Sequence, residues 1–225
     1  MPATSSLPSV GSRAARWGAL ALLVRPTYVA AELFVAAAAT GDYSLVADSI
    51  SRLGESGCSP SSCSPRHDVM NAAFVVSGAL LAGGAAPLRR SWGPTVTGLL
   101  VVSGLSSVAT GLAPLDRDVT LHVVAATPLF VAQPLALVAL GLRLRSDRPR
   151  LARAVLTTGA VTGAAAAVFV LAGDGPAAGA FERLAIWPVL GALAGAAWAV
   201  ARPRAALGSV LRPAGTGRTR WGSRR

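Results

Sequence analysis

Hydrophobic residues occur along this chain in long blocks that are separated by short polar segments. Each block is about 20 residues long, the length that an α-helix needs to cross the hydrocarbon core of a bilayer. A backbone in lipid must satisfy its own hydrogen bonds, and a single apolar block can do so only as a helix. The pattern predicts an all-α, polytopic membrane bundle of six transmembrane helices, at Trp17–Ala39, Val69–Ala86, Gly93–Leu112, His122–Leu142, Ala154–Ala172 and Leu184–Ala201.

The composition excludes a soluble domain. The 225 residues are 52% hydrophobic and 14% charged, with a mean hydropathy of +0.54, and a soluble globule needs far more polar surface. The formal charge of +11 comes from arginines gathered beside the predicted membrane spans. Such arginines usually meet anionic headgroups, so we expect membrane lipids and not nucleic acid as partners. The oligomeric state stays open.

The arginines are unevenly divided between the two sides of the predicted bundle. Sixteen of the 21 Arg lie on the side that holds both termini, whereas eight of the ten acids lie on the other side. The positive-inside rule therefore predicts a multi-pass protein of the cell membrane with both termini in the cytoplasm. A cleaved signal peptide in residues 1–39 is the alternative, but Arg25-Pro26 interrupts that run, which is also long for such a peptide.

This orientation divides the chain into three parts. Residues 1–16 form a cytoplasmic N-terminal segment, and residues 17–201 form the transmembrane domain, with a long extracytoplasmic loop at about 40–68. Residues 202–225 form a basic cytoplasmic tail that is rich in Gly, Pro and Arg, a composition typical of disorder.

The residues that are candidates for catalysis or ligand binding concentrate on the acid-rich side. Asp118 and His122 are four residues apart and share a helix face if the fourth helix starts before His122. A carboxylate beside an imidazole suits general-base catalysis or metal ligation. The alternative is that these residues cap helices and satisfy turns. The catalytic candidates are Glu32, Asp48, Ser51, Asp116 and His122, and the substrate-binding candidates are Ser49, His67, Asp68 and Asn71.

Two charges lie inside the first apolar block. Arg25 and Glu32 are separated by about two helical turns, so both can face the bundle interior, and Pro26 between them should kink the helix. Intramembrane charges are functional candidates because they are costly. Alternatively, Arg25 reaches inward along its stem while Glu32 reaches the outer headgroups or pairs within the bundle.

Cofactor chemistry finds little support. The chain has no nucleotide-binding motif, and two histidines with scattered acids support a zinc site only weakly, so we expect no cofactor and no metal. Cys58 and Cys63, the only cysteines, lie in the loop on the oxidising side, where a disulfide between them is expected.

Several short motifs lie around the first four predicted helices, namely Tyr43-Ser44, Ile50-Ser51-Arg52-Leu53-Gly54, Asn71, Gly78, Gly111 to Asp116, and His122. They resemble the pattern of a bacterial multi-pass membrane family catalogued as domain of unknown function 998 (DUF998). Its members share a Gly-Tyr-Ser stretch and an Ile-Ser-x-Leu-Gly run after the first helix, Asn and Gly in the second, and Gly-x-x-Pro-x-Asp followed by His. The resemblance covers roughly residues 20–200 and implies six helices, but it brings no established activity.

This chain departs from the family pattern at two places. It has Gly41-Asp42-Tyr43-Ser44 where a direct Gly-Tyr-Ser is usual, and it inserts a cysteine-containing segment before the second predicted helix.

The function is therefore predicted only in outline. The sparse chemistry favours a lipid-binding or lipid-sensing module or an accessory membrane protein. The alternative is an intramembrane enzyme acting on a lipophilic small molecule at the extracytoplasmic ends of the first four helices. It could be a hydrolase that uses Ser51, His122 and an acid, or a terpenoid cyclase started by Glu32 or Asp48. A small transporter is a third possibility. Many transporters contain an internal repeat, and we find none in this sequence.

Overall fold

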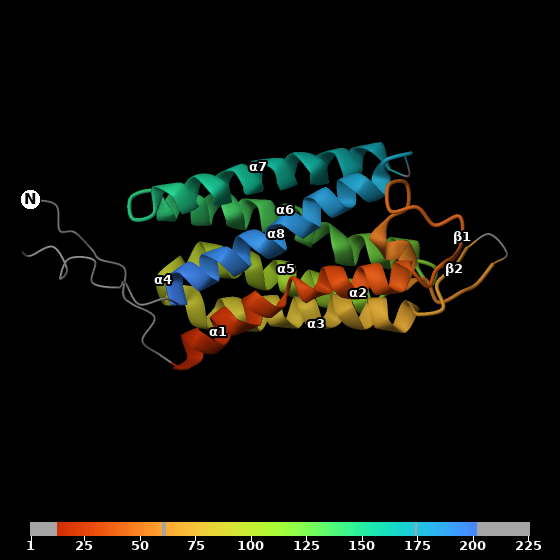
Figure 1. The fold of residues 1–225 in the computed structure, drawn as a ribbon, viewed down its shortest axis with the longest axis horizontal. Coiled ribbons are helices and arrows are strands. Elements are labelled where there is room, and N and C mark those ends of the chain that lie inside the picture. The colour runs from red at the N-terminus through yellow and green to blue at the C-terminus, as the bar shows by residue number, and fades with distance from the viewer. Residues whose placement is uncertain (1–12, 60–61, 174, 202–225) are drawn as a thin grey trace, which may run out of the picture.

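The computed structural model describes residues 13–59, 62–173 and 175–201. Within them six helical spans are long and apolar enough to cross a membrane, which confirms the predicted all-α, six-helix fold (Figure 1). They comprise α1 Arg13–Val24 with α2 Thr27–Ala36, α3 His67–Ala85 with η2 Ala86–Leu88 and α4 Arg89–Trp92, α5 Pro94–Leu112, α6 Val119–Leu144, α7 Pro149–Ala172, and α8 Ala178–Ala201. Most of the predicted N-terminal segment, Asp174 and the whole 202–225 tail lie outside the described residues.

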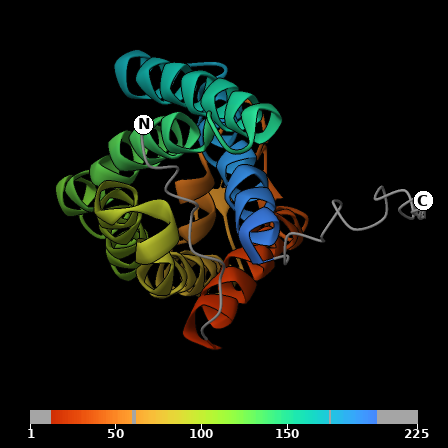
Figure 2. The same cartoon turned by 90° about the vertical axis from the view of Figure 1, so that its left-hand side faces the viewer.

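The six spans form a ring in chain order. Helix α3 packs against α5, then α5 against α6, α6 against α7 and α7 against α8, and α8 closes the ring against α1 (Figure 2). Because the number of spans is even, Arg13 and Ala201 lie at the same end of the bundle (Figure 1).

The two ends of the bundle differ in structure. We call the end with the described residues of 37–66, 113–118 and 173–177 the loop end. It carries β1 Thr40–Gly41 paired antiparallel with β2 Ser62–Cys63, and the 3-10 turn η1 Ile50–Gly54 (Figure 1). The opposite end holds α4 and the link from α6 to α7, and we call it the arginine end.

Two apolar clusters make up the core. One contains Leu22, Leu81, Trp92 and Leu140 toward the arginine end, and the other contains Phe74 and its neighbours toward the loop end. Buried polar side chains lie in the middle turns of the helices between the clusters, namely Arg25, Ser77, Ser103, Ser106, Ser107, Gln133 and Thr162.

Small residues allow α3 and α5 to pack closely against each other. At Gly78 of α3 an added Cβ would overlap the carbonyl oxygen of Gly104 in α5, and at Gly104 it would lie 2.6 Å from the carbonyl oxygen of Gly78. Glycine at both positions lets the two backbones approach, which is how membrane helices without a hydrophobic driving force gain packing energy.

The first span is broken where the proline was expected to kink it. Pro26 has no N–H, so the helical ladder stops at Val24 and restarts at Thr27. The Tyr28 N–H donates to the Arg25 carbonyl at 2.9 Å, three residues back instead of four. The break leaves Arg25 inside the ring, with 4% of its surface exposed.

The last span begins earlier than the apolar pattern predicts. Helix α8 starts at Ala178 instead of Leu184, so Glu182 and Arg183 lie in its first turns and not in a loop. Both are buried, at 2% and 5% exposure. A hydropathy pattern places charged residues outside a membrane span. Glu182 and Arg183 can lie buried within one because each has partners in the folded protein.

Candidate functional site

The turn η1 lies across the loop end of the ring. It contacts α2, α3 and α8, and its two large apolar residues, Ile50 and Leu53, are completely buried. The turn thus closes the loop end from above, with its apolar side chains inserted into the core below.

Each residue of this turn has a partner, and all but Arg52 find it in a distant part of the chain. The Ile50 N–H donates to the Glu182 carboxylate at 2.5 Å, the Leu53 carbonyl accepts from the Ser64 hydroxyl at 2.7 Å, and the Gly54 carbonyl accepts from the Asn71 amide at 2.9 Å. Arg52 forms an ion pair with Asp48, and Ser51 contacts His122. The predicted substrate-binding residue Asn71 therefore serves to hold the turn.

Ser51 and His122 form the most chemically informative contact. The Nε2 atom of His122 lies 2.9 Å from the Ser51 hydroxyl, and its Nδ1 atom lies 2.6 Å from the Ala113 carbonyl. A carbonyl can only accept, so Nδ1 carries the proton, and in the neutral ring Nε2 accepts from Ser51. This is the tautomer that a general base for Ser51 requires.

Among the described residues, the two ring nitrogens of His122 contact a carbonyl and a hydroxyl and no carboxylate. Asp118, expected on the same face, is the N-cap of α6 and accepts from the Leu121 N–H at 2.9 Å. The capping interpretation of Asp118 is therefore confirmed, and the carboxylate–imidazole pairing is wrong, because the cap turns the carboxylate toward the backbone.

A buried ion pair joins α2 to α8. The Arg183 Nε donates to Glu32 Oε1 at 2.8 Å, and the Trp187 indole N–H donates to Glu32 Oε2 at 2.9 Å. Glu32 has no exposed surface. The sequence predicts a partner within the bundle as one possibility for Glu32 but does not identify it. The structure shows that this partner is Arg183.

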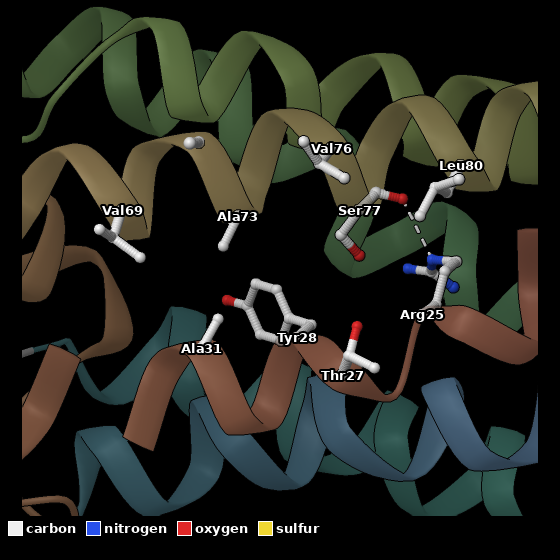
Figure 3. Close-up of a pocket in the computed structure, with 10 residues that line it drawn as sticks. Arg25, Thr27, Tyr28, Ala31, Val69, Ala73, Val76, Ser77 and Leu80 are labelled. Carbon is white, nitrogen blue, oxygen red and sulfur yellow. Dashed lines mark hydrogen bonds between the residues drawn. The ribbon is translucent and has the colours of Figure 1, made fainter. Parts of the chain in front are cut away.

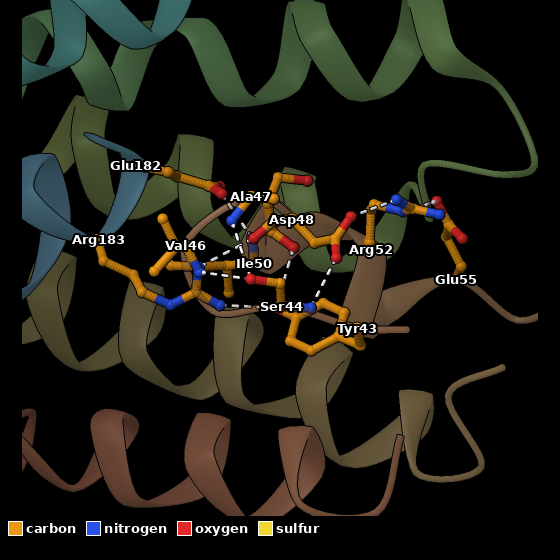
Figure 4. A network of polar contacts seen from close by, with 11 residues as sticks. Tyr43, Ser44, Val46, Ala47, Asp48, Ile50, Arg52, Glu55, Glu182 and Arg183 are labelled. Carbon is orange, nitrogen blue, oxygen red and sulfur yellow. Dashed lines mark hydrogen bonds and ion pairs between the residues drawn. The ribbon is translucent and has the colours of Figure 1, made fainter. Parts of the chain in front are cut away.

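Arg183 also fixes the loop that precedes η1 (Figure 4). Its Nη1 donates to the carbonyls of Leu45 and Asp48 at 2.6 and 2.9 Å, and its Nη2 donates to the Tyr43 hydroxyl at 2.6 Å. The Tyr43 hydroxyl donates in turn to the Ser49 carbonyl at 3.2 Å. Burial, which outweighs the opposing effect of Arg183, raises the pKa of Tyr43 to about 12, so this donor keeps its proton.

Asp48 acts on the backbone of the same loop. One carboxylate oxygen accepts from the Ser44 N–H at 2.7 Å and the other pairs with Arg52 (Figure 4). Glu32 and Asp48 thus both face an arginine.

Asp116 binds a separate part of the loop. Its carboxylate accepts from the backbone N–H groups of Ser56 and Gly57 at 3.1 and 2.8 Å and from the Ser56 hydroxyl at 3.0 Å. Burial alone would raise the pKa of Asp116, but these hydrogen bonds outweigh it and hold the pKa below its ordinary value. Next to it, burial raises the pKa of Glu55.

Among the predicted site residues, the structure brings Ser51 and His122 into contact, whereas Asp48, Asp116 and Asn71 bind other groups of the loop end. His67 pairs with the exposed Asp68 at 3.1 Å. Cys58 forms a disulfide with Cys63, next to the two short strands. Within the described part of the chain, no group of three His, Cys, Asp or Glu residues could hold a metal ion.

A cleft of about 240 Å³ opens between α2 and α3, at the break after α1 (Figure 3). Its walls are apolar apart from Arg25, Thr27, Tyr28 and Ser77. The rim residues Thr27, Val69, Ala72 and Val76 are exposed on the outside of the ring, so the cleft opens sideways between two helices.

Arg25 lies at one end of this cleft, with the Tyr28 ring along it (Figure 3). Its Nε donates to the Ser77 carbonyl at 3.1 Å, but its buried Nη1 and the buried Tyr28 hydroxyl have no partner among the described residues. Behind them a smaller cavity of about 20 Å³ reaches Gln133, whose side-chain oxygen is also without a partner there.

Sequence reasoning missed the residues that organise both places. The predicted span Leu184–Ala201 leaves Arg183 just outside the helix, although an arginine on the arginine-poor side next to Glu182 indicates a possible ion pair within the bundle. The sequence indicates Arg25 as a charge inside the first span, but it does not identify Ser77 as its partner, because Ser77 is 52 residues away.

Comparison with known proteins gives a family and no activity. The family model described as "Protein of unknown function (DUF998)" matches residues 22–202 of the chain. No curated protein and no solved structure matches it. The match covers well over half of the residues and includes η1, Asn71 and His122, so this multi-pass membrane protein belongs to the DUF998 family.

Proposed function

We propose that this protein binds a lipophilic molecule, taken up sideways from the bilayer, in the cleft between α2 and α3. The observation that carries this proposal is the cleft itself, with an exposed rim, apolar walls and a buried polar end. Ligand sites are typically concave and mostly apolar, with a few placed polar groups.

The position of the cleft across the bilayer fits a ligand that comes from the membrane. Arg25 is the thirteenth residue of the 24-residue span Arg13–Ala36, so the polar end of the cleft lies near the middle of the bilayer. An arginine at that depth costs about 3 kcal/mol or more, and such residues usually mark a functional site.

The loop end fits the role of a closure better than that of a binding site. Its charged side chains, Glu32, Arg183, Asp48 and Arg52, are bound to one another or to the backbone. Groups already satisfied by protein have little to gain from a ligand.

We place the protein in the cell membrane with its loop end extracytoplasmic. The arginine bias supports this orientation through the positive-inside rule, and a disulfide at the loop end suits an oxidising compartment.

Photolabelling can test the binding proposal. The protein would be placed in phosphatidylcholine nanodiscs with three C16 probes that carry the same mid-chain diazirine and end in a carboxylic acid, a primary amide or an alcohol. At least one probe should label α2 and α3 peptides beside the cleft. If none of the three does so, the cleft is not a lipid site.

Adjacent alanines provide a matched pair of variants. Ala31 lines the cleft, and Ala31→Phe should fill it and reduce labelling, whereas Ala30 is exposed and outside the cleft. Ala30→Phe places the same ring on the same helix and should leave labelling unchanged. Equal labelling of both variants would contradict the proposal.

Acyl-ester hydrolysis at Ser51 is a second candidate, favoured by the His122 tautomer. The Ser51 oxygen would attack the ester carbonyl, His122 Nε2 would take its proton and pass it to the leaving alcohol, and water would then release the acid from Ser51. A fluorophosphonate probe should label the natural protein and Ser49→Ala but not Ser51→Ala. No labelling of Ser51 would remove this candidate.

A further inference from the structure

We infer that the ligand of the α2–α3 cleft carries a carboxylate, which binds to Arg25. This inference rests on the proposed function and adds the chemical class of the ligand, a lipophilic carboxylic acid. The requirement comes from the charge of Arg25 and not from the shape of the cleft.

Arg25 is a buried cation without a counter-charge. Only 4% of its surface is exposed, and none of the acids in the described residues forms an ion pair with it. Its protein partner is the neutral carbonyl of Ser77, and Nη1 has no partner there. An uncompensated buried charge is strongly unfavourable, so an anion in the cleft would be bound tightly.

The residues that line the cleft and the small cavity behind it include no acid. The remaining lining residues are apolar or neutral, with the hydroxyls of Thr27, Tyr28 and Ser77 as the polar groups. A water molecule in the 20 Å³ cavity near Gln133 could give Nη1 a hydrogen bond, but it would add no charge. The missing component is therefore an anion.

A carboxylic acid fits this position better than a phosphate diester. A group that can take up a proton enters an apolar medium in its neutral form, whereas a phosphodiester must bring its charge to the middle of the bilayer. Once beside the guanidinium, the ionised acid gains charge-assisted hydrogen bonds from planar donors that match its own plane. A single acyl chain can also leave the cleft through the exposed rim into the lipid.

The three C16 probes test the inference when they are combined with variants of Arg25. In the natural protein, unlabelled palmitic acid should displace the acid probe at a concentration about tenfold or more below that at which palmitamide displaces the amide probe. Arg25→Gln should abolish this difference while the alcohol probe still labels the cleft. Arg25→Lys, which keeps the charge, should retain part of it.

Four results would overturn the inference. Equal affinity for acid and amide in the natural protein would leave the cleft a lipid site but not an anion site. An unchanged acid preference in Arg25→Gln would assign recognition elsewhere. Loss of all three probes in Arg25→Gln would show that Arg25 builds the cleft and does not read the ligand. Displacement of the acid probe by dioleoylphosphatidylglycerol as effective as by palmitic acid would assign a phosphodiester instead.

Discussion

Two arginines of the described residues are buried inside the membrane-spanning region, Arg25 and Arg183, and they differ in their partners. Arg183 is 5% exposed and Arg25 is 4% exposed. Arg183 binds a carboxylate, two carbonyls and a phenol, all from protein. Arg25 binds one carbonyl and faces a cleft. The comparison indicates that Arg183 stabilises the fold, whereas Arg25 lacks an anionic partner that a ligand would provide.

The surroundings of the two arginines fit this division. Arg183 joins α8 to α2 and to the loop before η1, so its removal would loosen three segments at once. Arg25 lies at a helix break between two core clusters, and its side chain donates one hydrogen bond, to the Ser77 carbonyl of α3, while Nη1 has no partner among the described residues. A buried charge that costs so much and makes so few contacts is best explained by a ligand.

Glu32→Gln should produce the largest effect, because it leaves the Arg183 charge buried without its counter-ion. Breaking a buried ion pair by removing one partner typically costs about 3–5 kcal/mol. We expect a loss of that order in the free energy of unfolding, measured by denaturant titration in mixed micelles.

The double variant Glu32→Leu with Arg183→Met is the control for that prediction. It removes both charges and keeps the approximate volume, so it should regain most of the lost stability. If the double variant is as unstable as Glu32→Gln, the packing of these side chains matters more than their charges.

Arg25→Gln should change stability in the opposite direction. Without added ligand, removing an unpaired buried charge should raise the free energy of unfolding, on the order of 1–3 kcal/mol. The same titration measures it, on protein freed of lipid. A loss similar to that of Glu32→Gln would mean that Arg25 is as structural as Arg183, and the contrast between them would disappear.

The sequence predicted the parts of this fold that depend on local pattern. Six spans follow from hydropathy, the break follows from Pro26, and the cap of α6 follows from Asp118 before an apolar run. It could not predict contacts between distant residues, such as Arg183 with Glu32, 151 positions away, or Ser51 with His122, 71 positions away. Such pairs form only when the ring of helices closes. A hydropathy pattern shows that each of these residues is polar, but it contains no information about its partner.

Gly54→Ala should disturb the closure at the loop end by an intermediate amount. A Cβ at Gly54 would overlap the side-chain oxygen of Asn71, which holds this turn. Overpacking of this kind costs about 1–3 kcal/mol. Gly83→Ala on α3 is the matched control, since a Cβ there meets nothing within 4 Å and alanine favours helix. Equal effects of the two substitutions would show that the turn tolerates movement.

Asp116→Asn should have the smallest effect, and its dependence on pH gives it a distinct signature. The folded pKa of Asp116 lies below its ordinary value, so its carboxylate stabilises the fold above the unfolded pKa of about 3.9. That contribution is lost as the pH falls through the lowered folded pKa. Since the residue is largely exposed, we expect less than about 1 kcal/mol at pH 7. The difference in unfolding free energy from the natural protein should shrink toward pH 3. A difference that stays constant between pH 7 and pH 3 would mean that the carboxylate charge of Asp116 does not hold the loop to the backbone of Ser56 and Gly57.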